Sequence, residues 1–429
     1  MDEARVGGAT SGYVALLRAN PSYRNLWLGQ VVSLLGDWFN LVATATLVQQ
    51  LTGSSAQVGL LFALRMLAPF LVSPFAGVVA DRFDRRRVLI ITDLLRAVVV
   101  LAFVLVKQPG DVWMLYVLTF VQLGLSGFFF PTQRAILPDV VPRRDLGTAN
   151  ALGSATWSTM LAFGAAAGGI VAGQFGVYPS FVIDCGTFLL SAFFLARVRV
   201  TRTETRVLRP GVAGSIHEYF EGLRYLRRHV DVALVACHKA ANSLLVAGGF
   251  QVVQVALAEQ VFVIGEGGSA GMGWIWSMVG LGTGFGPIIA RRFTGDDDVK
   301  LRRVLAYSYF ITCVGLIVVA AADVFAVVLI GALLRGIGAG MGWVFSTQLL
   351  LRLVPDRVRG RVFSTEFAML TLSSAIGSFA AGWAVDQPSV WITGSLLAMA
   401  ALVLIPGFLW TAWTLKYPAG LSGDADASS

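Results

Sequence analysis

The sequence predicts an all-α membrane protein with twelve transmembrane helices, arranged as two pseudo-symmetric six-helix bundles. Three observations lead to this fold class: the composition, the number of apolar segments and an internal repeat. The chain has 429 residues, of which 56% are hydrophobic and only 14% charged, whereas soluble domains contain about 25% charged residues. Because a soluble protein of this length still needs a polar surface, the composition indicates a membrane protein.

Twelve apolar segments are long enough to cross a hydrocarbon layer of about 30 Å. They are residues 25–50, 56–80, 88–107, 112–131, 148–173, 177–196, 232–257, 270–290, 303–322, 324–348, 363–385 and 390–413. The longest polar stretch between them divides the chain into two sets of six. We therefore expect a tail (1–24), a first bundle (25–196), a linker (197–231), a second bundle (232–413) and a second tail (414–429).

The two halves of the sequence resemble each other. Phe130-Pro-Thr-Gln133 follows the fourth segment, and Phe345-Ser-Thr-Gln348 follows the tenth. Val141-Pro-Arg-Arg144 and Val354-Pro-Asp-Arg357 then occur at similar distances downstream. Duplicated six-helix halves place a binding cavity between them, near the middle of the bilayer.

The basic residues predict the orientation. The net charge is +8. If the amino terminus is cytoplasmic, Lys107 is the one Lys or Arg in the outer loops, and nearly all the others lie in inner loops or tails. This asymmetry places both termini in the cytoplasm. The positive charge therefore predicts membrane orientation, and we expect no nucleic acid partner.

The linker contains an amphipathic pattern. Ile216, Phe220, Leu223 and Leu226 recur at helical spacing, with several arginines nearby. We expect a helix that lies against the inner leaflet of the bilayer and joins the two halves.

A charged motif follows the second segment, from Gly77 to Arg87. A glycine permits close helix contact, and a carboxylate at a helix end can bond arginines of a loop. The motif resembles the G-x-x-x-D-R-x-x-R-R signature of the major facilitator superfamily, with Asp84 in place of the usual Gly. The resemblance covers all twelve segments and implies a cytoplasmic gate or latch formed by Gly77, Asp81, Arg82, Arg85 and Arg86. Because Asp93, Arg96 and Glu366 lie near the inner ends of their segments, we expect them to join this latch.

A second stretch is similar to one branch of that superfamily. Phe130-Pro-x-x-Arg134-Ala-Ile-Leu-Pro138 and Leu146-Gly-Thr-Ala-Asn150 look like the enterobactin-type siderophore exporters and macrolide exporters. Bacterial lysophospholipid transporters resemble the same segments. The resemblance implies a multi-pass protein of the bacterial cytoplasmic membrane that works by alternating access.

Ionisable residues inside membrane segments are costly and suggest function. Asp37 shares a polar stripe of its helix with Gln30 and Asn40, so we expect this face to line a wet cavity. A structural ion pair with Arg65 or Arg335 is the alternative role. The expected proton-coupling or substrate-cavity residues are Asp37, Arg65, Lys239, Arg335, Gln30, Asn40 and Gln122. Weaker polar faces occur at Ser126 and Gln133, and at Asn150, Ser154 and Ser158.

The expected function is secondary active transport, specifically proton-coupled efflux of an amphiphilic small molecule such as a drug or siderophore. The alternatives are a lysophospholipid transporter and a non-transporting membrane sensor or scaffold. The sequence has no G-x-x-x-x-G-K-[S/T] nucleotide-binding loop and no metal-ligand spacing among its three cysteines. We therefore expect no enzyme activity, cofactor or metal. The expected partners are the substrate, protons and the lipid bilayer, and we expect a monomer.

Overall fold

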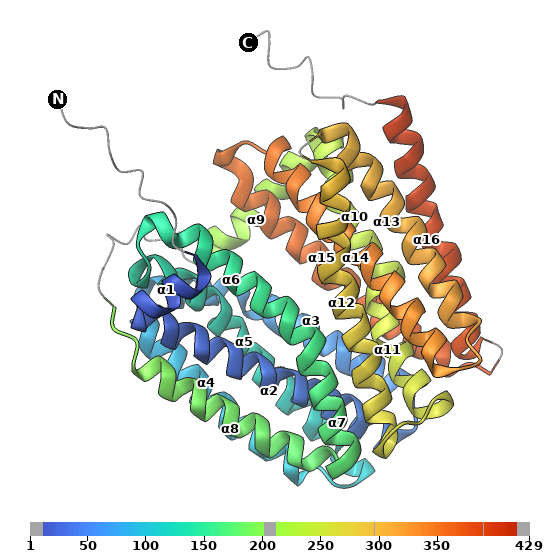
Figure 1. Cartoon of the computed structure of the whole chain (residues 1–429), viewed down its shortest axis with the longest axis horizontal. Helices are drawn as coiled ribbons and strands as arrows, with labels where there is room; N and C mark the ends of the chain where they lie inside the picture. The colour runs from blue at the N-terminus through green and yellow to red at the C-terminus, as the bar shows by residue number, and fades with distance from the viewer. Residues whose placement is uncertain (1–11, 201–211, 296, 389, 418–429) are drawn as a thin grey trace.

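The computed structural model describes residues 12–200, 212–295, 297–388 and 390–417, and its regular structure is helical (Figure 1). After α1 (Tyr13–Ala19), the first half contains α2 (Pro21–Thr52), α3 (Ser55–Arg82), α4 (Arg85–Ala102), α5 (Val112–Val140), α6 (Leu146–Thr159), α7 (Ala165–Phe175) and α8 (Val177–Ala196). The linker contains α9 (Val212–Arg228). The second half contains α10 (Val230–Asn242), α11 (Gly248–Ala256), α12 (Ser269–Thr294), α13 (Asp298–Ala320), α14 (Phe325–Leu353), α15 (Asp356–Val385) and α16 (Trp391–Lys416).

The described residues confirm the predicted transmembrane architecture. Two spans consist of paired helices, α6 with α7 and α10 with α11, joined through π-helical turns. Eleven spans are long and apolar enough to cross a membrane. The twelfth is α12, whose 26 residues include six glycines that lower its mean hydropathy.

Local sequence signals explain where several helices begin and end. The Asn20 side chain accepts a hydrogen bond from the Tyr23 amide at 2.9 Å, and Pro21 occupies the first position of α2. Gly53 ends the same helix with φ of 63°, a conformation that favours glycine. Asp84 caps α4 by accepting from the Arg87 amide at 2.8 Å. The Asp84 cap therefore sets the start of α4 directly after the turn from α3.

The repeated sequence motifs occupy equivalent helix ends. The Val141 amide donates to the Leu137 carbonyl at 2.9 Å, which closes α5. The Val354 amide donates to the Leu350 carbonyl at 3.0 Å and closes α14 in the same way. Each valine precedes a proline that cannot continue the helix. The two halves are thus copies of one six-helix arrangement.

The halves contact each other through symmetry-related helix pairs. The second span of the first half, α3, packs on the fifth span of the second half, α15. The reciprocal pair, α12 and α7, also packs together. In Figure 1 the bundles meet near α7 and α11 and diverge toward α1 and the carboxyl end of α16. We call the end with α1 and the end of α16 the terminal end, and the opposite end the distal end.

Large apolar side chains cover the outer surface of the helices. Leu101 on α4, Ile288 on α12 and Leu409 on α16 are all exposed. Such a surface is unfavourable in water and suits hydrocarbon, while the helices satisfy their own backbone hydrogen bonds. The outer surface therefore agrees with a multi-pass membrane protein.

The linker helix α9 packs on protein. Glu221 forms an ion pair with Arg361 of α15 at 2.9 Å, and Leu226 is buried. Gly222 approaches the Arg361 backbone so closely that a Cβ would lie 2.4 Å from its carbonyl oxygen. The expectation of a helix resting on lipid is therefore incomplete, because one face of α9 is docked on α15, while Phe220 is exposed.

Candidate functional site

A cavity of about 740 Å³ lies between the two halves. It is lined by side chains of α2, α5 and α6 from the first half and of α10, α12, α13, α14 and α15 from the second. Tyr23 and Ala149 line it close to the terminal starts of α2 and α6, whereas Leu34, Ser158 and Arg335 mark its deeper part. The cavity therefore occupies the terminal side of the molecule.

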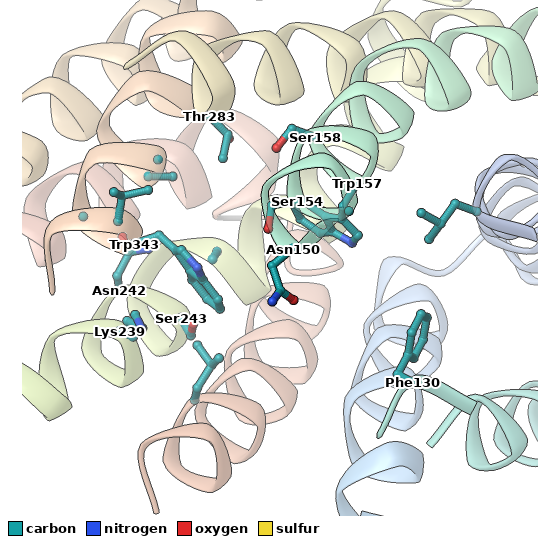
Figure 2. Close-up of a pocket in the computed structure, with 18 of the residues that line it drawn as sticks. Phe130, Asn150, Ser154, Trp157, Ser158, Lys239, Asn242, Ser243, Thr283 and Trp343 are labelled. Atoms are coloured by element: carbon teal, nitrogen blue, oxygen red, sulfur yellow. The ribbon is translucent and has the colours of Figure 1, made fainter. Parts of the chain in front are cut away.

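The first-half wall of the cavity combines hydroxyl, amide and aromatic groups. Asn150, Ser154 and Ser158 recur every four residues and share one face of α6. Figure 2 shows this face pointing into the cavity, with Trp157 on the same helix and Phe130 on α5 nearby. The wall offers polar contacts beside a broad apolar surface, which suits an amphiphilic molecule.

The second-half wall contains Lys239, Asn242, Ser243 and Trp343 (Figure 2). The Lys239 ammonium lies 4.6 Å from the centre of the Trp343 ring. A π-helical turn begins at Ser243, directly after α10. Such turns rotate the following side chains relative to an ordinary helix and are frequent at functional sites.

Tight glycine contacts close the distal end. A Cβ at Gly169 of α7 would lie 2.7 Å from the Gly273 Cα of α12, and a Cβ at Gly273 would lie 2.5 Å from the Ala165 carbonyl oxygen. The Thr46 and Ser269 hydroxyls, both buried, lie 3.1 Å apart across the same interface. Only glycine allows these backbones to approach so closely.

A carboxylate from one half also caps a helix of the other half. Asp386, which follows α15, accepts hydrogen bonds from the Ser54 hydroxyl at 2.7 Å and from the Ser55 and Ala56 amides at 2.8 and 3.0 Å. These amides form the amino end of α3, which attracts negative charge. Asp386 therefore ties the two halves together at the distal end.

Lys239 lines the cavity and is paired. Its ammonium lies 2.9 Å from the Glu366 carboxylate on α15 and donates to the Thr347 hydroxyl at 2.7 Å. Glu366 was expected in the latch that follows the second span. Its position contradicts that expectation, because α15 places Glu366 against α10 in the second half, where it neutralises Lys239.

A group of buried charges lies inside the first half. Arg96 of α4 donates to both carboxylate oxygens of Asp37 at 2.9 and 3.1 Å, and to Asp93 at 3.1 Å. The Arg96 guanidinium also lies 3.9 Å from the Phe188 ring centre. In this structure Asp93 and Arg96 therefore lie apart from the expected latch contacts, because Arg96 binds Asp37 of α2 and Asp93 binds Arg96.

Two further residues extend this group. Asp184 of α8 lies beside α2 at Gly36, where a Cβ would come within 2.2 Å of a carboxylate oxygen. Arg65 of α3 interacts electrostatically with Asp37 and Asp184. We call Asp37, Arg65, Asp93, Arg96 and Asp184 the first-half charge cluster; three carboxylates face two guanidinium groups. It carries one excess negative charge when all five are ionised.

Asp37 does not line the cavity, contrary to expectation, because Arg96 holds its carboxylate. It lies one helical turn beyond Leu34, which does line the cavity. The Asp37 side chain is 20% exposed, whereas those of Asp93 and Arg96 are fully buried. Asp37 is therefore the most exposed member of this ion-paired triad.

Arg335 lines the cavity without a carboxylate partner among the described residues. Its side chain is only 6% exposed, its guanidinium lies 5.0 Å from the Phe250 ring centre, and its Nε has no hydrogen-bond partner. The proposed pairing of Arg335 with Asp37 does not occur, since Arg96 binds Asp37.

The loop after α3 fastens helices of the first half to each other. Arg85 forms an ion pair with Asp139 of α5 at 2.8 Å. Arg86 donates to the Leu195 carbonyl at 3.2 Å and to the Ala196 carbonyl, both at the end of α8. Arg85 and Arg86 therefore bind backbone and carboxylate groups at the terminal end.

The remaining motif residues are Gly77, Asp81 and Arg82. Arg82 is exposed, and the Asp81 side chain lies outside the described residues. A Cβ at Gly77 would meet no atom within 4 Å, so the expected close helix contact is absent from this conformation. Gly77 lies in the last two turns of α3, which ends at Arg82.

The expected polar residues separate into two groups. Gln30 lines the cavity, as do Gln133 and the polar face of α6. Asn40 and Gln122 are buried outside it, and neither amide oxygen has a hydrogen-bond partner.

Sequence reasoning missed the aromatic lining of the cavity by Trp27, Trp157 and Trp343. A tryptophan in an apolar segment gives no sign of whether it faces a cavity or lipid.

The described residues contain no group of three or more His, Cys, Asp or Glu side chains arranged to hold a metal ion. The cavity chemistry available from this chain consists of cationic, amide, hydroxyl and aromatic groups.

Comparisons with known proteins agree with the fold. YfiS, an MFS-type transporter of Bacillus subtilis (strain 168), is 28% identical over 416 residues, covering 91% of this chain and 94% of YfiS. The putative bacilysin exporter BacE of Bacillus amyloliquefaciens is 26% identical, covering 83% and 87%. The crystal structure of a bacterial homologue of the human lysosomal transporter Spinster, in an inward-facing and unoccupied conformation, matches with a TM-score of 0.71 at 14% identity, covering 92% of this chain and 98% of that chain.

The family model of the Major Facilitator Superfamily matches residues 26–296, more than half of the chain. This match begins within α2 and extends through the rest of the first half to α12. The chain therefore belongs to the major facilitator superfamily of membrane transporters.

Proposed function

We propose that this transporter exports an amphiphilic small molecule by proton-coupled alternating access. The observation that carries the proposal is the cavity between the halves, which combines aromatic and polar walls and lies on the terminal side of a closed distal interface. A putative exporter among the relatives supports efflux as the direction of transport.

The distribution of Lys and Arg supports a cytoplasmic location for the terminal end. In that orientation the protein is a multi-pass protein of a bacterial cytoplasmic membrane, and the structure corresponds to a conformation that receives substrate from the cytoplasm. Transport then requires the distal contacts at Asp386 and Gly273 to separate while the terminal ends approach each other.

Asp37 is the proposed proton-carrying group. Protonation removes its charge and weakens its two hydrogen bonds with Arg96, while Asp93 keeps a bond to the same guanidinium. The first-half charge cluster then loses its excess negative charge. A proton can therefore change the packing of α2 on α4, and α2 contributes Gln30 to the cavity wall.

Dye transport in proteoliposomes with an imposed pH gradient tests this proposal. We expect Asp37→Asn to abolish the stimulation by the gradient. Asp298→Asn is a matched control, because Asp298 also pairs with an arginine, Arg352, but is exposed and outside the cavity. Full gradient-driven transport by Asp37→Asn would refute the coupling role, and the absence of flux for any amphiphilic dye in the unmodified protein would refute the proposed export.

A further inference from the structure

We infer that the transported molecule carries an anionic group, carboxylate or phosphate, that binds Arg335 in the deep part of the cavity. This inference rests on the proposed export function and specifies its substrate class.

The cavity lining has a one-sided charge. Among the described residues that line it, Arg134, Lys239 and Arg335 are cationic, and none is Asp or Glu. A cavity lined by one sign of charge attracts ligands of the opposite sign. The lining therefore favours an anionic ligand over an organic cation, although many drugs are cations.

The three cations differ in what neutralises them. Glu366 pairs with Lys239 at 2.9 Å, so this charge is balanced inside the protein. Arg134 is exposed toward the terminal end and can be hydrated. Arg335 is buried, with 6% exposure, and no carboxylate approaches it within ion-pair distance in the described residues. Arg335 is thus a buried cation in the cavity lining, and no carboxylate among the described residues balances its charge.

Burying an unbalanced guanidinium is unfavourable unless a ligand or water supplies acceptors. The Nε of Arg335 lacks a hydrogen-bond partner, and its guanidinium lies 5.0 Å from the Phe250 ring centre. A guanidinium presents paired donors that match the oxygens of a carboxylate or phosphate. The site is therefore equipped to bind one oxyanion.

The rest of the ligand is apolar. Trp157 and Phe130 are substantially exposed toward the cavity, on the half opposite Arg335 (Figure 2). A ligand with one anionic end and an apolar body can contact Arg335 and this aromatic surface together. Since these groups lie on different halves, such a ligand also bridges the two bundles that move during transport.

The test uses the full-length protein in nanodiscs and a matched probe pair, 11-(dansylamino)undecanoic acid and its methyl ester. The dansyl fluorescence reports binding, and the two probes share the fluorophore and the apolar chain but end in a carboxylate and in an uncharged methyl ester, respectively. We expect the acid to bind at least about tenfold more tightly, which corresponds to one charge-assisted hydrogen-bonded contact. Equal affinity of the acid and the ester would overturn the inference.

Variants assign the effect to Arg335. We expect Arg335→Gln to reduce the acid-to-ester affinity ratio about tenfold and Arg335→Lys to restore part of it. Arg292→Gln is the matched control, because it removes an exposed arginine of the same half outside the cavity. A ratio that is unchanged in Arg335→Gln, in protein whose thermal unfolding matches that of the control, would overturn the inference.

Competition distinguishes the source of the anion. Displacement of the acid probe by N-lauroylglycine alone would indicate a free carboxylate, and displacement by lysophosphatidylglycerol alone would indicate a phospholipid head group; either outcome supports an anion site, and displacement by neither contradicts it. Gradient-driven flux of a neutral dye is measured separately. Retained flux without anion preference would refute the inference while leaving the export proposal intact.

Discussion

The hydrogen bonds of Asp386 predict how strongly one side chain holds the distal end closed. Asp386→Ala removes three hydrogen bonds to the amino end of α3, from the Ser54 hydroxyl and the Ser55 and Ala56 amides. Loss of a capping side chain costs about 0.5–2 kcal/mol, and the exposure of Asp386 keeps the effect within that range. We take about 1–2 kcal/mol as the free-energy cost of Asp386→Ala, which corresponds to a change of about 5- to 30-fold in the equilibrium between closed and open distal ends.

This cost falls on the conformation with a closed distal end, because the halves must separate there to open. The population with an open distal end should therefore rise about 5- to 30-fold. Ser269→Cys reports on that population, since Ser269 is fully buried at the distal interface. In a background in which Cys185, Cys237 and Cys313 are replaced, we measure labelling by a membrane-impermeant maleimide added from the distal side.

The expected result is a labelling rate that rises in proportion to the open population. Asp386→Asn should have a smaller effect, because it keeps an acceptor oxygen and loses the charge. Asp297→Ala is the control: Asp297 caps α13 through the Lys300 amide at 3.0 Å, within one half. A labelling rate unchanged by Asp386→Ala, or raised equally by Asp297→Ala, would refute the assignment of Asp386 as an inter-half contact.

Two further predictions concern packing. Gly273→Ala places a Cβ 2.5 Å from the Ala165 carbonyl oxygen, so α7 and α12 must separate; we expect about 1–3 kcal/mol of destabilisation of this conformation and a lower Tm. Gly284→Ala, with no atom within 4 Å, should leave the Tm equal or higher, and equal losses in both variants would contradict the packing argument. Lys239→Gln leaves Glu366 buried without its cation, which costs about 3–5 kcal/mol. Adding Glu366→Gln should recover part of the Tm, and no recovery would show that the pair is not the source of the loss.

The sequence predicted the fold because each membrane span is a local property of the chain. Apolar length, caps such as Asn20 and the repeated Val-Pro turns at Val141 and Val354 depend on neighbouring residues only. These signals placed all twelve helices, including α12, whose glycines lower its mean hydropathy. The repeat also predicted the pseudo-symmetry of the halves.

The sequence indicated which charges lie in the membrane, but not which partners they have. Polar spacing on α2 favoured a cavity position for Asp37, and the structure instead pairs it with Arg96, nearly sixty residues away. Glu366 of α15 likewise pairs with Lys239 of α10. The physical reason is that a helix face can be read from periodicity, whereas the helix that covers this face depends on tertiary packing.

Composition, span number and charge asymmetry were thus determined by the sequence alone, since hydrophobic transfer and helix formation act locally. Only the tertiary structure decided that no carboxylate of the described residues pairs with Arg335, that aromatic side chains form part of the cavity wall and that Asp386 caps a helix of the other half. Each of these features depends on the distance between atoms on different helices, which no single helix specifies.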